Sequence, residues 1–194
     1  MEREGPSGLA PKPIGELDQD ELIIRLLFTV NHLSRWLTPI HDETRLVRAV
    51  RRSEPSVKEL VIELRDQELR VFPRMHAIAT QNRPDLDRLP PVVRSTADIA
   101  WDDQASVFEI VAEFRRLRQS TTSLLRSLPN DAWARDGISR NEHDWTIRSL
   151  AEYLLLDDSR LLARMDEALL RTGVRDRIAA VSRASYEELQ RLAP

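Results

Sequence analysis

Two carboxylates on separate predicted helices are the residues whose type and position could support metal chemistry. Glu63 lies in the helix predicted over residues 57–79, and Asp157 lies in the helix predicted over residues 145–165. A carboxylate from each of two facing helices is an arrangement that hard divalent cations accept. On a wheel of about 100° per residue, however, Glu63 lies about 110° and Asp157 about 70° from the centre of its apolar stripe. These angles predict a solvated position for Glu63 and a rim position for Asp157, so a metal site is the less favoured interpretation.

Three further charged residues fall within the apolar stripes themselves. They are Glu68 in the second helix, Arg118 in the helix predicted over residues 107–128, and Asp158 beside Asp157. Burying an isolated charge is costly, so Arg118 is expected to pair with one or both carboxylates. One interpretation is an ion network that fixes the helix register. The other is a pocket floor in which Arg118 binds an anionic ligand or holds a catalytic carboxylate. The first is preferred, because ionic networks inside bundles often need no ligand.

Other residue types that could do chemistry are not arranged for it. The histidines, which are His32, His41, His76 and His143, show no HxxxH or HExxH pairing, and the chain has no cysteine. His32 is predicted on the polar side of its helix. The serines and threonines at 120–123 have no elbow motif and no neighbouring base. Histidine or thiolate metal sites are therefore not predicted, and packing on a helix surface is preferred for the hydroxyl residues.

Local sequence signals place these residues on helices. A small polar residue followed three positions later by Glu can form a capping box, in which each side chain satisfies a backbone donor at the helix start. Such boxes open predicted helices at Asp18–Glu21, Ser56–Glu59, Ser106–Glu109 and Ser185–Glu188. Asp144 is predicted to cap a helix that begins at Trp145. Apolar residues spaced three and four apart follow these starts without a competing strand pattern, so the fold class predicted is all-α.

The longest predicted connection determines the topology. Residues 83–105 contain Pro84, Pro90 and Pro91 and lack sustained periodicity. A long link permits parallel neighbours. The sequence therefore predicts a four-helix bundle over residues 16–172 with a long crossover between helices two and three, which run the same way. Residues 1–15 are predicted to be a flexible N-terminus, and residues 173–194 a C-terminal helical extension.

Composition excludes several classes of function. The chain has 194 residues with a formal charge of −3, from 29 basic and 32 acidic residues, so it offers no global attraction for nucleic acid or anionic lipid. It contains no apolar stretch near the ~18 residues that a membrane span requires, and its N-terminus lacks the apolar core of a secretory signal. A cytoplasmic protein that binds neither nucleic acid nor membrane is expected.

Three segments together resemble the DinB/YfiT-like superfamily of four-helix-bundle metalloenzymes. They are SVKELVIELRDQELRVFPRM (56–75), VFEIVAEFRRLRQSTTSLLRSLPNDAWARDG (107–137) and TIRSLAEYLLLDDSRLLARM (146–165). Each is similar to a diffuse helix pattern of that superfamily, and their order and spacing cover most of the chain. The resemblance implies the same fold, and it also makes a homodimer an expected assembly.

The resemblance also identifies where a metal would bind. Members commonly hold a divalent ion such as nickel or zinc through three histidines, whose positions here are occupied by Glu63, Asp157 and Leu161. Leucine cannot ligate a metal, and without imidazole nitrogens the usual zinc or nickel site is not expected. The charged positions around that site are matched by Asp66, Glu68, Arg74, Arg118 and Asp158. A scaffold that has kept its inward charges and lost its metal ligands is predicted.

These observations lead to one preferred function and two alternatives. The preferred function is a metal-free, noncatalytic module that binds a small ligand or forms a homodimer, with a candidate pocket formed by Glu63, Glu68, Arg118, Asp157 and Asp158. No catalytic residue and no cofactor are assigned. The first alternative is a divergent transferase or isomerase that uses a carboxylate-bound divalent metal ion or a metal-free Arg/Glu/Asp pocket. The second is an interaction module in a stress response.

Overall fold

Four long helices form the body of the computed structural model, which describes residues 12–49, 51 and 53–171. The helices are α1 (Gln19–Leu37), α2 (Thr44–Val47), α3 (Val57–Thr80), α4 (Thr96–Gln104), α5 (Val107–Ser127) and α6 (Ile147–Arg171). Short 3-10 helices are η1 (Ile14–Glu16), η2 (Leu86–Arg88) and η3 (Asn130–Ala134), and two short strands are β1 (Asp136–Gly137) and β2 (Trp145–Thr146). The all-α prediction is confirmed. Within the described residues, no helix is long and apolar enough to span a bilayer.

The helix starts follow the predicted capping boxes wherever the structure describes them. Both reciprocal hydrogen bonds form at Asp18–Glu21, Ser56–Glu59 and Ser106–Glu109. The box at Ser185–Glu188 and the helical extension at 173–194 lie outside the described residues, as do residues 1–11 of the predicted flexible N-terminus.

The predicted start of the last helix is wrong by two residues. Asp144 does not cap it, because Trp145 and Thr146 form strand β2 and the helix begins at Ile147. The hydroxyl of Thr146 instead accepts a hydrogen bond from the backbone N–H of Ser149 at 3.0 Å. Asp144 accepts from the backbone of Ser139 in the preceding loop. A strand of two residues is too short to leave an alternating pattern in the sequence. The helical periodicity of α6 therefore predicts helix through Trp145 and Thr146 as well.

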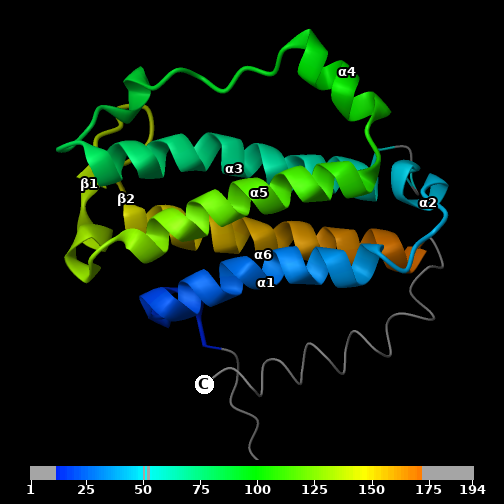
Figure 1. Ribbon diagram of the computed structural model, residues 1–194, viewed down its shortest axis with the longest axis horizontal. Coiled ribbons are helices and arrows are strands. Elements are labelled where there is room, and N and C mark those ends of the chain that lie inside the picture. Colours follow the sequence, from blue (N-terminus) through cyan, green and yellow to red (C-terminus); the bar gives the residue numbers. More distant parts are fainter. Residues whose placement is uncertain (1–11, 50, 52, 172–194) are drawn as a thin grey trace, which may run out of the picture.

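The four long helices are arranged so that α3 and α5 run in the same direction (Figure 1). Helix α3 packs on α5 and α6, and α1 packs on the same two helices from the other side. Along α3, Arg65 pairs with Glu113 and Glu68 pairs with Arg118 further along α5, as parallel helices require. The predicted parallel pair joined by a crossover is confirmed.

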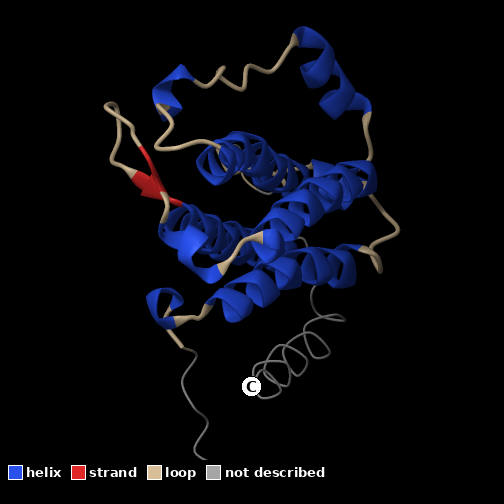
Figure 2. Cartoon of the chain, turned by 60° about the vertical axis from the view of Figure 1, so that its left-hand side comes forward, coloured by secondary structure: helices blue, strands red, loops and turns tan. Residues whose placement is uncertain are grey.

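The crossover contains regular structure that the sequence pattern did not predict. It includes η2 and the nine-residue helix α4, which begins with a capping box between Ser95 and Asp98. Figures 1 and 2 show the crossover on the side of α3 and α5 that faces away from α1. Asp102 is the buried residue of α4. A helix without an apolar face has no hydrophobic period to detect, which is why the segment was expected to be irregular.

A layer of polar residues divides the core into two apolar clusters. The cluster at the α2 end includes Val30, Leu64, Phe114 and Leu161, and the cluster at the β1 end includes Leu26, Val71, Leu125 and Leu155. Between them, each long helix contributes at least one buried polar side chain, and these are Thr29, Glu68, Arg118, Thr121 and Asp158, here called the polar layer. The bundle is therefore held by two hydrophobic cores with a charged layer between them.

A glycine in β1 allows the crossover to pack closely against the end of α3. Gly137 pairs with Trp145 in the two-stranded sheet, and the next residue, Ile138, exchanges backbone hydrogen bonds of 2.8 Å with the chain at Pro84 and Leu86. A Cβ atom at Gly137 would lie 2.9 Å from side-chain atoms of both Ile78 and Leu86. Real Cβ atoms do not approach carbon atoms this closely, so only glycine fits without a shift of the neighbours.

Gly137→Ala is expected to destabilise the protein by about 1–3 kcal/mol, because the added methyl group overpacks the contact with Ile78 and Leu86. The measurement is the free energy of unfolding in urea. Gly15→Ala is the matched control, since a Cβ atom there has nothing within 4 Å. Equal effects of the two substitutions would contradict the close packing at Gly137.

Candidate functional site

Arg118 lies at the centre of the polar layer with 0% of its surface exposed. Its Nε donates to Oε1 of Glu68. Its Nη1 donates to Oδ2 of Asp158 at 2.6 Å and to the backbone carbonyl of Leu26 at 3.0 Å, and its Nη2 donates to Oδ1 of Asp158 at 2.9 Å. The guanidinium group of Arg118 therefore joins α5 to the other three long helices. Glu68, Arg118 and Asp158 all lie inside the bundle, as their helical periodicity predicts.

Two threonines complete the hydrogen bonding of the carboxylates. The hydroxyl of Thr121 donates to Oε2 of Glu68 at 2.5 Å, and that of Thr29 donates to Oδ2 of Asp158 at 2.7 Å. Burial alone would lower the pKa of Arg118, but the two carboxylates raise it above its ordinary value, so the guanidinium stays charged. A bound anion would have to displace one of these internal partners. The geometry therefore matches the ion-network interpretation more closely than a pocket floor.

Two of the three positions that the resemblance assigns to metal ligands, Glu63 and Asp157, lie between α3 and α6 and pair with arginines. Glu63 accepts from Arg160 at 3.0 Å and from Arg164 at 3.4 Å, while Oδ1 of Asp157 lies 2.6 Å from Nη2 of Arg160. These four residues are here called the rim site. Asp157 is buried, with 8% of its surface exposed, so it lies deeper than the rim position that the sequence predicts. Leu161 is fully buried in the apolar cluster at the α2 end.

The rim site does not fit a divalent metal ion. Leu161 offers no donor atom, and the carboxylates of Glu63 and Asp157 are already paired with Arg160 and Arg164, whose charges repel a cation. No group of three or more His, Cys, Asp or Glu side chains in the described part of the chain is arranged to hold a metal. The donor set therefore differs from that expected of the superfamily.

One atom of the rim site lacks a hydrogen-bond donor. Oδ2 of Asp157 is buried and has no hydrogen-bond partner, whereas Oδ1 of the same carboxylate accepts from Nε of Arg160 at 3.0 Å and lies 2.6 Å from its Nη2. Buried polar atoms in folded proteins are nearly always hydrogen-bonded, so this oxygen is an exception that points to a missing donor. It is the one buried side-chain nitrogen or oxygen without a partner among the described residues.

A polar contact that the sequence did not suggest lies one turn away on the same face of α6. The side-chain amide of the buried Gln67 donates to the hydroxyl of Tyr153 at 2.7 Å, and Arg70 donates to the amide oxygen of Gln67. The ring of Tyr153 lies 5.4 Å from that of Trp145. Gln67 and Tyr153 are 86 residues apart, so only the packing of α3 on α6 brings them together.

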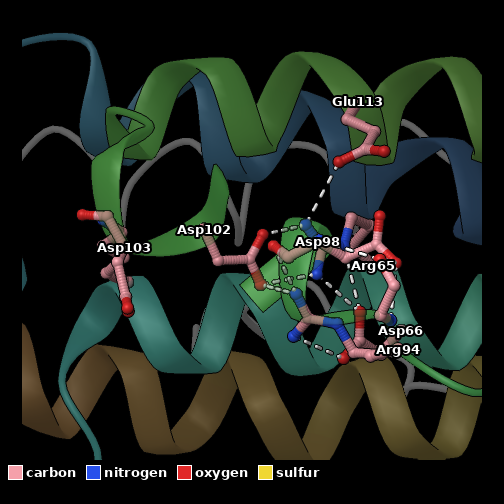
Figure 3. Close-up of polar contacts among 9 residues, drawn as sticks. Arg65, Asp66, Arg94, Asp98, Asp102, Asp103 and Glu113 are labelled. Atoms are coloured by element: carbon pink, nitrogen blue, oxygen red, sulfur yellow. Dashed lines mark hydrogen bonds and ion pairs between the residues drawn. The ribbon is translucent and has the colours of Figure 1, made fainter. Parts of the chain in front are cut away.

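A second ion network joins the crossover to the bundle (Figure 3). It consists of Arg65, Asp66, Arg94, Asp102 and Glu113, here called the crossover cluster. Arg65 is 3% exposed and Asp102 is 4% exposed. Sequence reasoning missed this cluster. The available signal was Arg65 itself, an arginine next to Leu64 in the apolar stripe of α3.

The histidines are dispersed among the described residues. The ring of His32 lies 4.1 Å from that of Trp36 on α1, and burial, followed by the charge of Arg35, lowers its pKa to about 4. His32 is thus half-buried rather than fully on the polar side. His143 is exposed in the loop before β2, with its ring 4.0 Å from that of Trp145.

Arg118→Leu is expected to destabilise the protein by about 3–5 kcal/mol, because it leaves two buried carboxylates without their cation. Urea unfolding measures the change, and Arg116→Leu, an exposed position on the same helix, is the control. If the single variant does not fold, the triple variant Glu68→Leu, Arg118→Met, Asp158→Leu is expected to recover most of the loss, since it removes all three charges. A small effect of Arg118→Leu would contradict the structural role of the polar layer.

Acid is expected to weaken the crossover cluster. Burial would raise the pKa of Asp102, but hydrogen bonds from Arg65 and Arg94 hold that pKa below its ordinary value. Such a carboxylate stabilises the fold above its unfolded-state pKa of about 4, and this contribution is lost as the pH falls through the folded-state pKa. The stability difference between the wild type and Asp102→Asn should therefore be constant near neutral pH and shrink below about pH 4. A difference that stays constant in acid would be evidence against the pairing.

Comparison with known proteins shows what the fold is similar to. No protein-family model and no curated protein matches the sequence. Among solved structures, YfiT from Bacillus subtilis, described as a probable metal-dependent hydrolase with an unusual four-helix bundle topology, matches with a TM-score of 0.65. The match covers 84% of this chain and 93% of YfiT, at 19% sequence identity. The chain therefore has the DinB/YfiT-like four-helix bundle fold.

Proposed function

We propose that this chain is a metal-free, cytoplasmic module that binds a small ligand at the rim site between α3 and α6. The observation that carries the proposal is Oδ2 of Asp157, a buried carboxylate oxygen without a donor. Leaving such an acceptor unsatisfied costs about 1–3 kcal/mol. A ligand that supplies an N–H or O–H group would recover this free energy on binding.

The surroundings of that oxygen support a polar ligand. Arg160 approaches Asp157 from one side and donates to Oδ1 alone, so Oδ2 is not committed to the ion pair. Glu63 lies on the facing helix, α3, and Tyr153 lies on α6, one turn before Asp157. Both side chains are partly exposed. These groups offer further acceptors and an aromatic face to a ligand that enters from solvent.

The polar layer serves this site by holding α6 in register. Asp158 accepts three hydrogen bonds, two from Arg118 and one from Thr29, and this orientation places the preceding residue, Asp157, at the edge of the α3–α6 interface. In this proposal Glu68, Arg118 and Asp158 are positioning residues and make no contact with the ligand. The alternative of a carboxylate metal site, in line with the description of YfiT, would use the same Glu63 and Asp157, and a separate experiment tests it.

The experiment compares the melting temperatures of the untagged protein in acetamide and in N,N-dimethylacetamide at equal concentration. Both amides are neutral, so Arg160 and Arg164 do not repel them, but only acetamide has N–H donors. The melting temperature is expected to be higher in acetamide, and Asp157→Asn is expected to reduce the difference because it replaces the free acceptor. Glu167→Gln, an exposed position on the same helix, is the control. The same difference in the wild type and in Asp157→Asn would argue against a site at Asp157.

Metal analysis of the same preparation tests the alternative. The protein is analysed for bound metal and titrated with nickel, zinc, manganese and magnesium, and the measurements are repeated on Glu63→Ala and Asp157→Ala. No stoichiometric metal and no metal-induced shift are expected, because Arg160 and Arg164 already neutralise the carboxylates. A stoichiometric metal ion lost in both variants would overturn the metal-free proposal and favour an enzyme.

A further inference from the structure

Helix α4 of the crossover is an acidic helix whose apolar residues belong to neither hydrophobic cluster of the bundle. Its nine residues, TADIAWDDQ, include Asp98, Asp102 and Asp103 and no basic residue. Asp102 is its buried residue, whereas Ile99 is 49% exposed and Trp101 is 42% exposed. Hydrophobic burial therefore contributes little to holding this helix in place.

Cations hold α4 instead. Arg65 of α3 forms a bidentate ion pair with the Asp102 carboxylate, in which Nη1 donates to Oδ1 at 2.5 Å and Nη2 donates to Oδ2 at 2.9 Å (Figure 3). Arg94 donates to the same carboxylate and, at 3.1 Å, to the backbone carbonyl of Asp98. At the end of the helix, Lys58 of α3 donates to the carbonyl of Asp103 at 3.1 Å.

The arrangement around Asp102 is that of an anion receptor. A guanidinium fork that makes two parallel hydrogen bonds matches the geometry of a carboxylate or a phosphate, and a second arginine reinforces it. Arg65 also pairs with Asp66 and Glu113, so it stays partnered and oriented when Asp102 leaves, and Arg94, which precedes α4 in the chain, is tied to α3 through Asp66. Without Asp102, the two arginines have the carboxylates of Asp66 and Glu113 as their remaining partners, and Lys58 of α3 loses its bond to the Asp103 carbonyl.

We propose that Arg65 and Arg94 form an oxyanion-binding site that α4 closes with its own Asp102 carboxylate. Docking of α4 and binding of an external carboxylate or phosphate group at these arginines are then mutually exclusive. The site is separate from the rim site, because Arg65 faces the crossover and Glu63 faces α6. Undocking of α4 is expected to have a small free-energy cost, because segments with few buried apolar contacts open locally while the core stays folded.

Hydrogen exchange of the backbone amides of residues 97–104, measured on the full chain, tests this site. The conditions are sodium chloride, sodium acetate and sodium phosphate at matched ionic strength, so that screening is equal and only specific binding differs. Phosphate, acetate or both are expected to accelerate exchange in α4 several-fold over chloride while leaving α3 and α5 unchanged. The arm that responds identifies the preferred oxyanion. Identical exchange in all three salts would overturn the proposal.

Variants at two neighbouring aspartates sharpen the test. Asp102→Asn is expected to accelerate exchange in α4 about tenfold or more, because it removes the charge-assisted hydrogen bonds that dock the helix. It is also expected to increase the thermal stabilisation by phosphate, since the arginines are no longer occupied. Asp103→Asn removes the same charge from an exposed side chain, whose backbone carbonyl still accepts from Lys58, and should resemble the wild type. Equal behaviour of the two variants would refute the site, and Asp157→Asn should leave α4 unaffected, which separates it from the rim site.

Discussion

The ion pairing of Arg118 is the interaction on which the rest of the bundle depends. A guanidinium with no solvent exposure is tolerated because α1, α3 and α6 each present an acceptor at the correct height, through the Leu26 carbonyl, Glu68 and Asp158. Sliding α3 or α6 by one turn would move Glu68 or Asp158 out of this layer and leave Arg118 without one of its two buried carboxylates, at a cost of several kcal/mol. The two hydrophobic clusters on either side can be repacked in many ways, whereas the polar layer accepts one register.

That register has consequences at the surface of α6. Asp157 and Asp158 are adjacent, so the inward orientation of Asp158 places Asp157 about 100° around the helix, at the edge of the α3–α6 interface. The same geometry turns Leu161 into the core, where it packs in the apolar cluster at the α2 end. The three positions that the resemblance assigns to metal ligands therefore carry an ion-paired carboxylate, a half-satisfied carboxylate and a leucine.

The parallel arrangement of α3 and α5 imposes a different constraint, because the chain must return along the full length of the bundle between them. In this protein the return segment is attached through charges: the crossover cluster joins Arg65 on α3 to Asp102 on α4, with Arg94 between them. Charge-assisted hydrogen bonds give a precise position without a second hydrophobic core. They also respond to competing ions, which apolar packing does not.

The sequence by itself determined the features that depend on neighbours within a few residues. The capping boxes at Asp18, Ser56 and Ser106 determine three helix starts, and helical periodicity places Glu68, Arg118 and Asp158 inside the bundle, where burial of charge predicts that they pair. The long link predicted the parallel pair. Only the tertiary structure decided which groups meet across the bundle, as Arg65 meets Asp102 and Gln67 meets Tyr153, and that one carboxylate oxygen of Asp157 has no hydrogen-bond donor. These contacts join residues tens of positions apart and therefore leave no local pattern in the sequence. Helix α4 leaves none either, because it has no apolar period. The physical reason is that local backbone bonding sets helix boundaries, whereas side-chain pairing at a distance is set by the one register that the polar layer permits.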